Sequence, residues 1–151
     1  MAPTSIVKHI FRVPYALYQW FVFVPILAVL TLVFGLLVLF LVFTVSPSIA
    51  SRICGTAWAR LIGFFIPIFV KIEGRENIVR GQSYIIISNH MSQYDIPLLY
   101  GWIGLDFRWV MKQELRKVPM LGIACERIGH IFIDRSNKNK AIESINNAKR
   151  V

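Results

Sequence analysis

One short segment of this chain holds a histidine and an aspartate at a spacing that could support proton transfer. It runs from Asn89 to Asp95 (NHMSQYD) and directly follows an apolar run, SYIIIS, at 83–88. Five residues of continuous helix turn about 500°, so on one helix His90 and Asp95 would point in different directions. If His90 lies in a loop and Asp95 in the first turn of a helix, the two side chains can meet. A carboxylate on one imidazole nitrogen would leave the other nitrogen free as a general base.

The same spacing also fits a purely structural histidine that caps the helix and has a satisfied hydrogen bond. Ser92 could itself cap that helix, and Asp95 near its positive end would stay ionised. The spacing alone does not separate the two interpretations.

A second group of polar residues stands at the end of another apolar run, GHIFIDR, at 129–135. Open α/β sheets bind ligands at the carboxyl ends of their strands, and a guanidinium suits bidentate phosphate recognition. Arg135 is therefore a candidate phosphate ligand, with a solvated basic loop as the alternative. We expect His130 to be structural and Asp134 to pair with Arg135.

The part of the chain before these segments is strongly apolar. No charged residue occurs between Arg12 and Arg52, and the densest part, Trp20 to Val45, spans 26 residues. As a helix it would measure about 39 Å, enough to cross a hydrocarbon core of about 30 Å, whereas the apolar part of a signal peptide is about 7–15 residues long. The sequence predicts a membrane segment.

This segment could cross the membrane once or form a helical hairpin that enters and returns. Pro25, Gly35 and the Ser46–Ser48 turn could each interrupt a helix. After the turn, residues 49–70 are apolar with two arginines about two helical turns apart, as on a helix that lies at the interface with snorkelling side chains. We favour the hairpin or interfacial arrangement.

Near residue 68 the long apolar runs give way to short apolar runs separated by charged residues. We therefore expect an N-terminal membrane-anchoring helical segment at 1–67 and an αβ layer at 68–151. Strands that alternate with helices predict a mostly parallel sheet with crossover connections. The expected strands are 68–74, 83–88, 107–111 and 130–134, and the expected helices are 96–103, 113–117, 121–127 and 139–150.

Composition narrows the class of protein. Of the 151 residues 56% are hydrophobic and 17% charged, with mean hydropathy +0.57, which excludes intrinsic disorder. The net charge of +9 favours an anionic partner, but no nucleic-acid-binding motif is recognisable and we expect no nucleic acid. No Gly-rich phosphate loop is present, and Cys54 and Cys125 are too few for a zinc site or a disulfide scaffold.

Considered together, these segments resemble a known family. NHMSQYD resembles the His-x4-Asp block of the glycerolipid acyltransferases, the 1-acyl-sn-glycerol-3-phosphate acyltransferase family. GHIFIDR is similar to that family's second block, and residues 112–122 (KQELRKVPMLG) are similar to the segment between the two. VKIEGRENI at 70–78 resembles the first strand of the family's domain, so that the resemblance covers about residues 68–151.

The resemblance implies a membrane-bound enzyme that transfers a fatty acyl group from acyl-CoA or acyl carrier protein to the free hydroxyl of lysophosphatidic acid. It implies His90 as the base, Asp95 as its orienting acid and Arg135 as the ligand of the acceptor phosphate, with no metal and no cofactor. The catalytic part would face the cytoplasm. Supporting residues within the matched blocks are Asn89, Ser92, Lys112, Glu114 and Gly129.

The chain departs from the family pattern in one respect. The family has a third block of the type Phe-Pro-Glu-Gly-Thr-Arg and a fourth apolar block, and neither occurs here. We therefore expect the N-terminal portion of a longer acyltransferase. The alternatives are an acyltransferase with another acceptor, such as glycerol 3-phosphate or a lysophospholipid, and a non-catalytic membrane-anchored remnant.

Overall fold

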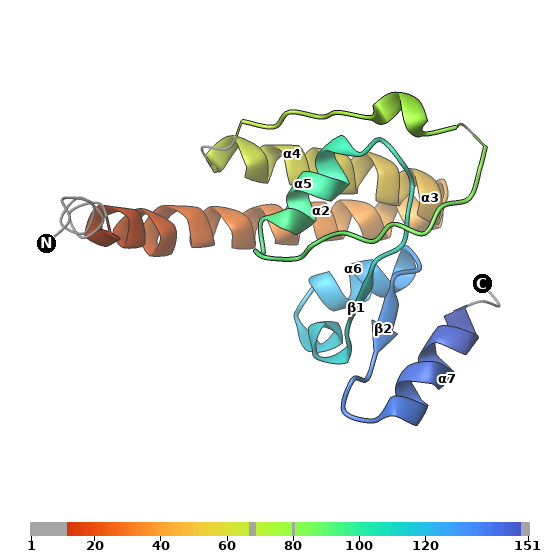
Figure 1. Ribbon diagram of the computed structural model, residues 1–151. Coiled ribbons are helices and arrows are strands. Elements are labelled where there is room, and N and C mark those ends of the chain that lie inside the picture. The colour runs from red at the N-terminus through yellow and green to blue at the C-terminus, as the bar shows by residue number, and fades with distance from the viewer. Residues whose placement is uncertain (1–11, 67–68, 80, 149–151) are drawn as a thin grey trace, which may run out of the picture.

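The computed structural model describes residues 12–66, 69–79 and 81–148. A long helix is flanked by a returning helical segment and by α5, and a small layer of strands and helices lies below it in the view of Figure 1. The helices are α2 (Val24–Thr44), α3 (Pro47–Ala50), α4 (Thr56–Phe65), α5 (Asp95–Trp102), α6 (Leu121–Arg127) and α7 (Lys138–Ala148), and the strands are β1 (Val110–Lys112) and β2 (Ile131–Ile133). Single π-helical turns occur at Gln19–Phe23 and Ser51–Gly55, and 3-10 turns at Arg75–Asn77 and Gln113–Lys117.

The first helix is continuous from Arg12 to Thr44 and is the one described helix long and apolar enough to cross a membrane. Pro25 lies in the first turn of α2 and does not break it. Proline lacks the N–H of a regular helical hydrogen bond, and the π-helical turn just before it accommodates the change, with the Val24 N–H donating to the Gln19 carbonyl. Gly35 also lies within α2. Of the three predicted points of interruption, only the Ser46–Ser48 turn ends the helix.

The chain reverses direction at that turn, where Ser46 Oγ accepts a hydrogen bond of 3.2 Å from the Ile49 N–H and caps α3. From there α4 runs back along α2 (Figure 1). The Trp58 indole N–H donates to Thr31 Oγ1 across the pair at 3.2 Å. The hairpin geometry is therefore present in the structure.

Helix α5 packs on a stripe of small residues on the returning segment. The tightest contacts are at Gly55, where a Cβ would lie 2.4 Å from the Tyr100 ring, and at Gly63, where it would lie 2.6 Å from the Trp102 ring. The Tyr100 hydroxyl also hydrogen-bonds Ser51 Oγ at 2.7 Å in a buried position. The stripe has a spacing of four residues and consists of Ser51, Gly55, Ala59 and Gly63. Because α5 packs so closely here, these contacts set its position on the hairpin.

The sheet is smaller than predicted. β1 and β2 pair in parallel, with Val110 opposite Ile131, and the connection between them contains α6. This confirms the parallel crossover, a strand within 130–134 and helices near 96–103 and 121–127. The helical region at 113–117 is a 3-10 turn, and the helix predicted at 139–150 is present up to Ala148, with residues 149 and 150 outside the described residues. The strand predicted at 107–111 is shifted, since β1 covers 110–112.

Two predicted strands are wrong. Residues 69–74 and 83–88 belong to no strand, and residue 68 lies outside the described residues. Ile85 and Ile87, expected in a buried strand, are 90% and 89% exposed. A strand needs a neighbour to pair its backbone N–H and C=O groups, and the 83–88 segment has no ladder partner among the described residues. The described chain is therefore mostly helical, with its α/β character confined to the unit from β1 to β2.

That unit packs directly on the hairpin. One buried cluster joins Val38 of α2, Ala50 of α3 and Cys54 to Ala124 and Ile128 at α6. At Gly35 the missing side chain makes room for Met120, whose Cβ lies 3.2 Å from where a glycine Cβ would stand. The two parts expected at 1–67 and 68–151 thus share a core, although residues 67 and 68 lie outside the described part of the chain.

Candidate active site

The Asp95 side chain organises the loop that precedes it. Its Oδ2 atom accepts hydrogen bonds from the Met91 N–H at 2.8 Å, the Ser92 N–H at 2.8 Å and His90 Nδ1 at 3.1 Å. Asp95 is the first residue of α5, and Pro97 in that first turn has the fixed φ that suits a helix start. The predicted arrangement, a loop histidine and a first-turn aspartate, is confirmed.

These hydrogen bonds favour the charged carboxylate. The Ser92 N–H is the largest cause that lowers the pKa of Asp95, and the bonds from His90 and Met91 lower it further. An ionised Asp95 accepts a hydrogen bond from Nδ1–H of His90, which leaves the lone pair of Nε2 unprotonated in the neutral ring. The His90 side chain is 56% exposed and that of Asp95 25%. The pair can therefore act as a base towards a molecule that approaches from solvent.

Ser92 supports the turn rather than the helix. Its Oγ accepts the Tyr94 N–H at 3.2 Å, and its carbonyl accepts the Asp95 N–H at 3.2 Å. The N-cap of α5 is Tyr94, which has no side-chain cap. The expectation that Ser92 caps the helix is therefore wrong in detail, because the hydroxyl closes the loop one residue earlier. Asn89 is exposed in the same loop.

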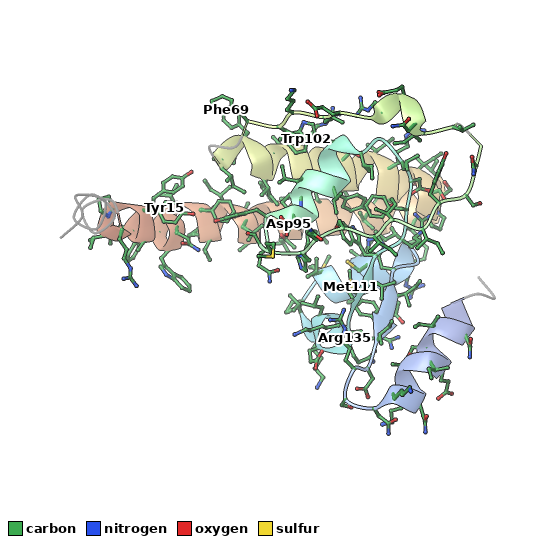
Figure 2. All side chains as sticks on the ribbon, viewed as in Figure 1. Tyr15, Phe69, Asp95, Trp102, Met111 and Arg135 are labelled. Carbon is green, nitrogen blue, oxygen red and sulfur yellow. The ribbon has the colours of Figure 1, made fainter. Side chains whose placement is uncertain are left out.

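The second predicted group lies elsewhere. Arg135 follows β2 and is exposed, and Figure 2 shows it beyond the end of that strand, apart from Asp95. Asp134 does not pair with Arg135 as expected. Its carboxylate accepts the Ser136 N–H and hydroxyl at 3.0 and 2.5 Å, and Lys140 Nζ lies 3.8 Å away. In the described structure Arg135 does not contact the histidine–aspartate pair.

The supporting residues of the intervening block lie around the two strands. Lys112 ends β1 and Glu114 lies in the 3-10 turn that follows, both exposed. Gly129 has a φ of +86° and ends α6, its N–H bonded to the Glu126 carbonyl and the next N–H to the Cys125 carbonyl. This is the Schellman arrangement, which favours glycine. The structure thus gives Gly129 a local role away from His90.

Two other reactive groups are buried. His130 is 7% exposed, and burial, with the nearby Arg108 as the second cause, lowers its pKa to about 4. It is neutral and accepts the Trp109 N–H at 3.4 Å, in keeping with the structural role expected for it. Burial raises the pKa of Cys125 to about 12, so its thiol is a poor nucleophile. No group of three or more His, Cys, Asp or Glu in the described residues could hold a metal ion.

The sequence analysis missed what holds the far end of α5. Arg60 Nε donates to the Gly101 carbonyl at 3.0 Å, and Arg75 Nη2 donates to the Trp102 carbonyl at 2.5 Å. Cations at a helix C-terminus complement its dipole, as Asp95 does at the N-terminus. Arg60 was expected to snorkel at an interface, and here it fastens α5 instead. A basic residue next to the small-residue stripe is the signal that could have revealed this contact.

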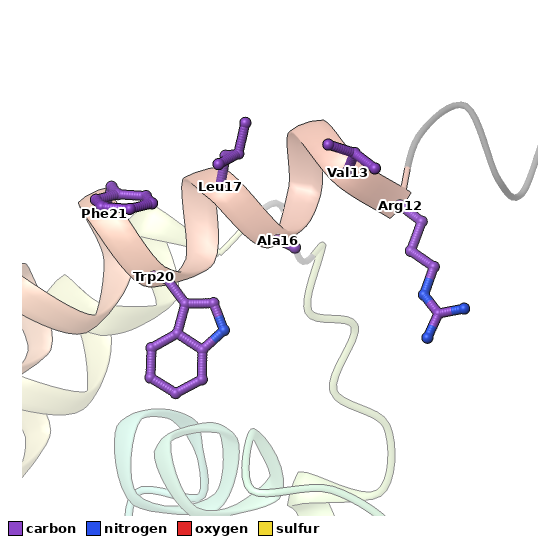
Figure 3. A pocket seen from close by; sticks show the side chains of 6 residues that line it. All are labelled: Arg12, Val13, Ala16, Leu17, Trp20 and Phe21. Atoms are coloured by element: carbon purple, nitrogen blue, oxygen red, sulfur yellow. The ribbon is translucent and has the colours of Figure 1, made fainter.

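Two hollows on the described surface have linings that do not include His90 or Asp95. One, shown in Figure 3, is lined by a single face of the first helix, from Arg12 to Phe21. The other lies between α4 and the end of α5, near Arg52 and Phe64. The histidine–aspartate pair lies outside both hollows, with the His90 side chain 56% exposed and that of Asp95 25% exposed.

Comparisons with known proteins place the two blocks in context. The family model described as Acyltransferase matches residues 69–151. The 1-acyl-sn-glycerol-3-phosphate acyltransferase of Saccharomyces cerevisiae is 31% identical over 65% of this chain and 32% of its own length. The enzyme of that name from Limnanthes douglasii is 30% identical over 94% of this chain and 50% of its own length. The human 1-acyl-sn-glycerol-3-phosphate acyltransferase alpha is 31% identical over 54% of this chain and 29% of its own length.

This chain spans half or less of the length of these relatives. No solved structure matches it significantly. The matched region contains His90, Asp95 and Arg135.

Proposed function

The chain belongs to the glycerolipid acyltransferase family, and we propose that it transfers a fatty acyl group to the free hydroxyl of lysophosphatidic acid, giving phosphatidic acid. The donor would be acyl-CoA or acyl carrier protein. The observation that carries the proposal is the 3.1 Å hydrogen bond between His90 Nδ1 and the ionised Asp95, inside the matched region. The names of the yeast and plant relatives support this acceptor.

The proposed step is a direct transfer. Nε2 of His90 takes the proton of the acceptor hydroxyl while the oxygen attacks the thioester carbonyl carbon. A carbon–oxygen bond forms, the carbon–sulfur bond breaks, and the departing thiolate receives the proton from the imidazolium. Asp95 holds the ring in the productive tautomer and stabilises the imidazolium as it forms. Because the thioester is already activated, the scheme requires no acyl-enzyme.

Arg135 is proposed as the ligand of the acceptor phosphate. It is exposed at the carboxyl end of β2, where a guanidinium can offer two parallel N–H donors to a phosphate. Asp134, its neighbour, is occupied by Ser136 and Lys140 and leaves the guanidinium unpaired within the described contacts. This role depends on the family resemblance, since the structure does not bring Arg135 to His90.

We further propose that the hairpin lies at the membrane boundary rather than crossing the bilayer. The apolar residues of α2 are exposed on one side, among them Phe40 and Phe43. The other side is covered by α4 and, near Gly35 and Val38, by α6. A helix whose later part packs against a layer with charged residues cannot be surrounded by lipid over that part. A boundary position would also give His90 access to a lipid hydroxyl from the cytoplasmic side.

The test is transfer of a radiolabelled acyl group by the purified chain in lipid vesicles. We expect labelled phosphatidic acid with lysophosphatidic acid as acceptor and a loss of about 10²–10⁴-fold in rate for His90→Ala. Gln93→Ala is the matched control, since Gln93 is exposed in the same loop. Equal loss in both variants, or no effect of His90→Ala on a measurable rate, would contradict the proposal.

The same assay decides between the alternatives. Glycerol 3-phosphate or a lysophospholipid as the better acceptor would replace lysophosphatidic acid while leaving the role of His90 intact. No transfer to any acceptor by a protein that also contains the family's third and fourth blocks would favour the non-catalytic remnant.

A further inference from the structure

The loop that carries His90 has a single side-chain anchor. From Asn89 to Gln93 every residue is exposed, and the described hydrogen bonds of these five residues are made within the loop, to Tyr94 or to Asp95. Tyr94 is the first residue of the segment whose side chain packs on another element. The position of the loop on the hairpin therefore depends on α5, which follows it, and on what Tyr94 contacts.

The Tyr94 ring lies against the hairpin. It meets the Phe23 ring edge to face, with centroids 6.1 Å apart and planes at 73°. It also packs against the buried cluster of Phe23, Ile62 and Ile66, which joins the first helix to α4. An aromatic pair of this geometry is favourable beyond the area it buries.

The Tyr94 hydroxyl extends the contact by a hydrogen bond. It lies 3.2 Å from the Tyr15 hydroxyl on the first helix, 79 positions away in sequence. That bond, with partial burial as the second cause, raises the pKa of Tyr94 to about 12, so the hydroxyl is neutral and able to donate. Ring and hydroxyl together bind Tyr94 to two residues of one helix.

We propose that Tyr94, held by Tyr15 and Phe23, is a positioning residue that fixes the His90–Asp95 pair on the apolar hairpin. The expected effect on catalysis rests on the proposed function, whereas the expected effect on the loop rests on the geometry alone. Asp95 follows Tyr94 directly, and the Tyr94 N–H bonds Ser92 Oγ. A movement of the Tyr94 ring therefore displaces both the carboxylate and the loop that donates to it.

The structural consequence can be measured without turnover. The Met91 and Ser92 amides donate to Asp95, so their hydrogen exchange reports whether the loop is closed. In the full chain in vesicles we expect Tyr94→Ala to speed exchange of these amides about 10-fold or more, and Tyr94→Phe or Tyr15→Phe about two- to tenfold, the range of one neutral hydrogen bond. Exchange within α6 should not change.

Tyr18→Phe is the matched control. Tyr18 lies on the same helix one turn later, and its hydroxyl donates to the Phe65 carbonyl at 2.7 Å rather than to Tyr94. If any weakening of the first helix's contacts loosened the loop, Tyr18→Phe would speed exchange as much as Tyr15→Phe. We expect it to leave the Met91 and Ser92 amides unchanged.

The catalytic consequence is a selective fall in kcat. Tyr94→Ala should lower kcat about 10- to 100-fold, as small misplacements of a catalytic group do, with little change in KM for either substrate. Tyr15→Phe and Tyr94→Phe should each lower it about two- to tenfold, and the double variant no further, because both remove the same bond.

Two results would overturn the inference. One is unchanged exchange at Met91 and Ser92 in Tyr94→Ala, and the other is full additivity of the two Phe variants. If His90→Ala abolishes transfer while the tyrosine variants behave like wild type, the positioning role is wrong and the proposed function stands. If wild type shows no transfer but exchange responds as expected, the proposed function fails and the anchoring role is retained.

Discussion

The two histidines of the described chain occupy opposite environments. His90 lies half exposed in a loop, with an ionised carboxylate on Nδ1 and no hydrogen bond to Nε2 from the described residues. His130 is buried at the start of β2, near Arg108, and its pKa is lowered to about 4. The same side chain is thus open to solvent beside a carboxylate in one region and kept neutral as a packing element in the other. The environment, rather than the residue type, separates a candidate base from a structural histidine.

The largest expected effect comes from replacing each of the two histidines by alanine and comparing activity with stability. His90→Ala should lower kcat about 10²–10⁴-fold with little change in thermal unfolding, because the side chain is exposed. His130→Ala should instead lower the free energy of unfolding by about 2 kcal/mol or more, since it leaves a cavity beside Tyr100 and Trp109. Acyl-transfer kinetics and thermal denaturation of both variants check this. A large loss of stability in His90→Ala would break the comparison.

Stability should depend on pH through His130. Its folded pKa of about 4 lies below the ordinary 6.5, so between these values the unfolded chain binds the proton more readily. Stability is therefore full above about pH 6.5 and is lost as pH falls towards 4, by up to about 3 kcal/mol. Denaturant unfolding across this range should show the loss in wild type and not in His130→Phe. Asp95 and Asp134, whose pKa values are lowered, add their loss only at more acid pH.

A smaller effect is expected at Arg135. If it holds the acceptor phosphate, Arg135→Gln should raise KM for lysophosphatidic acid about tenfold, the loss of roughly 1.4 kcal/mol from one charge-assisted contact. KM for the donor should stay constant. Lys138→Gln, an exposed neighbour at the start of α7, is the control. Equal KM values in wild type and Arg135→Gln would remove Arg135 from the site.

The smallest effect concerns the segment just before the loop. Ile85→Ser should change the free energy of unfolding of this chain by less than about 0.5 kcal/mol, because the side chain is 90% exposed. Ile133→Ser in β2, where the side chain is buried, is the contrasting variant and should cost several times more. Denaturant titration of both tests whether 83–88 is unpaired in solution.

Sequence reasoning succeeded where the interactions are local. The His90–Asp95 contact spans five residues and follows from a loop that enters a helix. The helix expected around 121–127 is α6, Leu121–Arg127, and the glycine at 129 that ends it is a local signal. The helical hairpin was predicted from one long apolar run and a Ser-Pro-Ser turn.

Sequence reasoning failed where the structure of a segment depends on residues far away in the chain. The run at 83–88 has the β-branched composition of a buried strand, but composition cannot say whether a neighbouring strand is present. The contact of Tyr94 with Tyr15 joins residues far apart in sequence and has no local signature. The surface on which α5 packs does have a local signal, since small residues repeat every four positions from Ser51 to Gly63.

The tautomer of His90 tests the central claim most directly. Two-bond proton–nitrogen correlation spectra of the labelled chain distinguish a proton on Nδ1 from one on Nε2 in the neutral ring. The account predicts the Nδ1–H form in wild type, and a mixed population in Asp95→Asn once the carboxylate is neutralised. A neutral His90 that carries its proton on Nε2 in wild type would contradict it, because the nitrogen facing the acceptor could then not serve as the base.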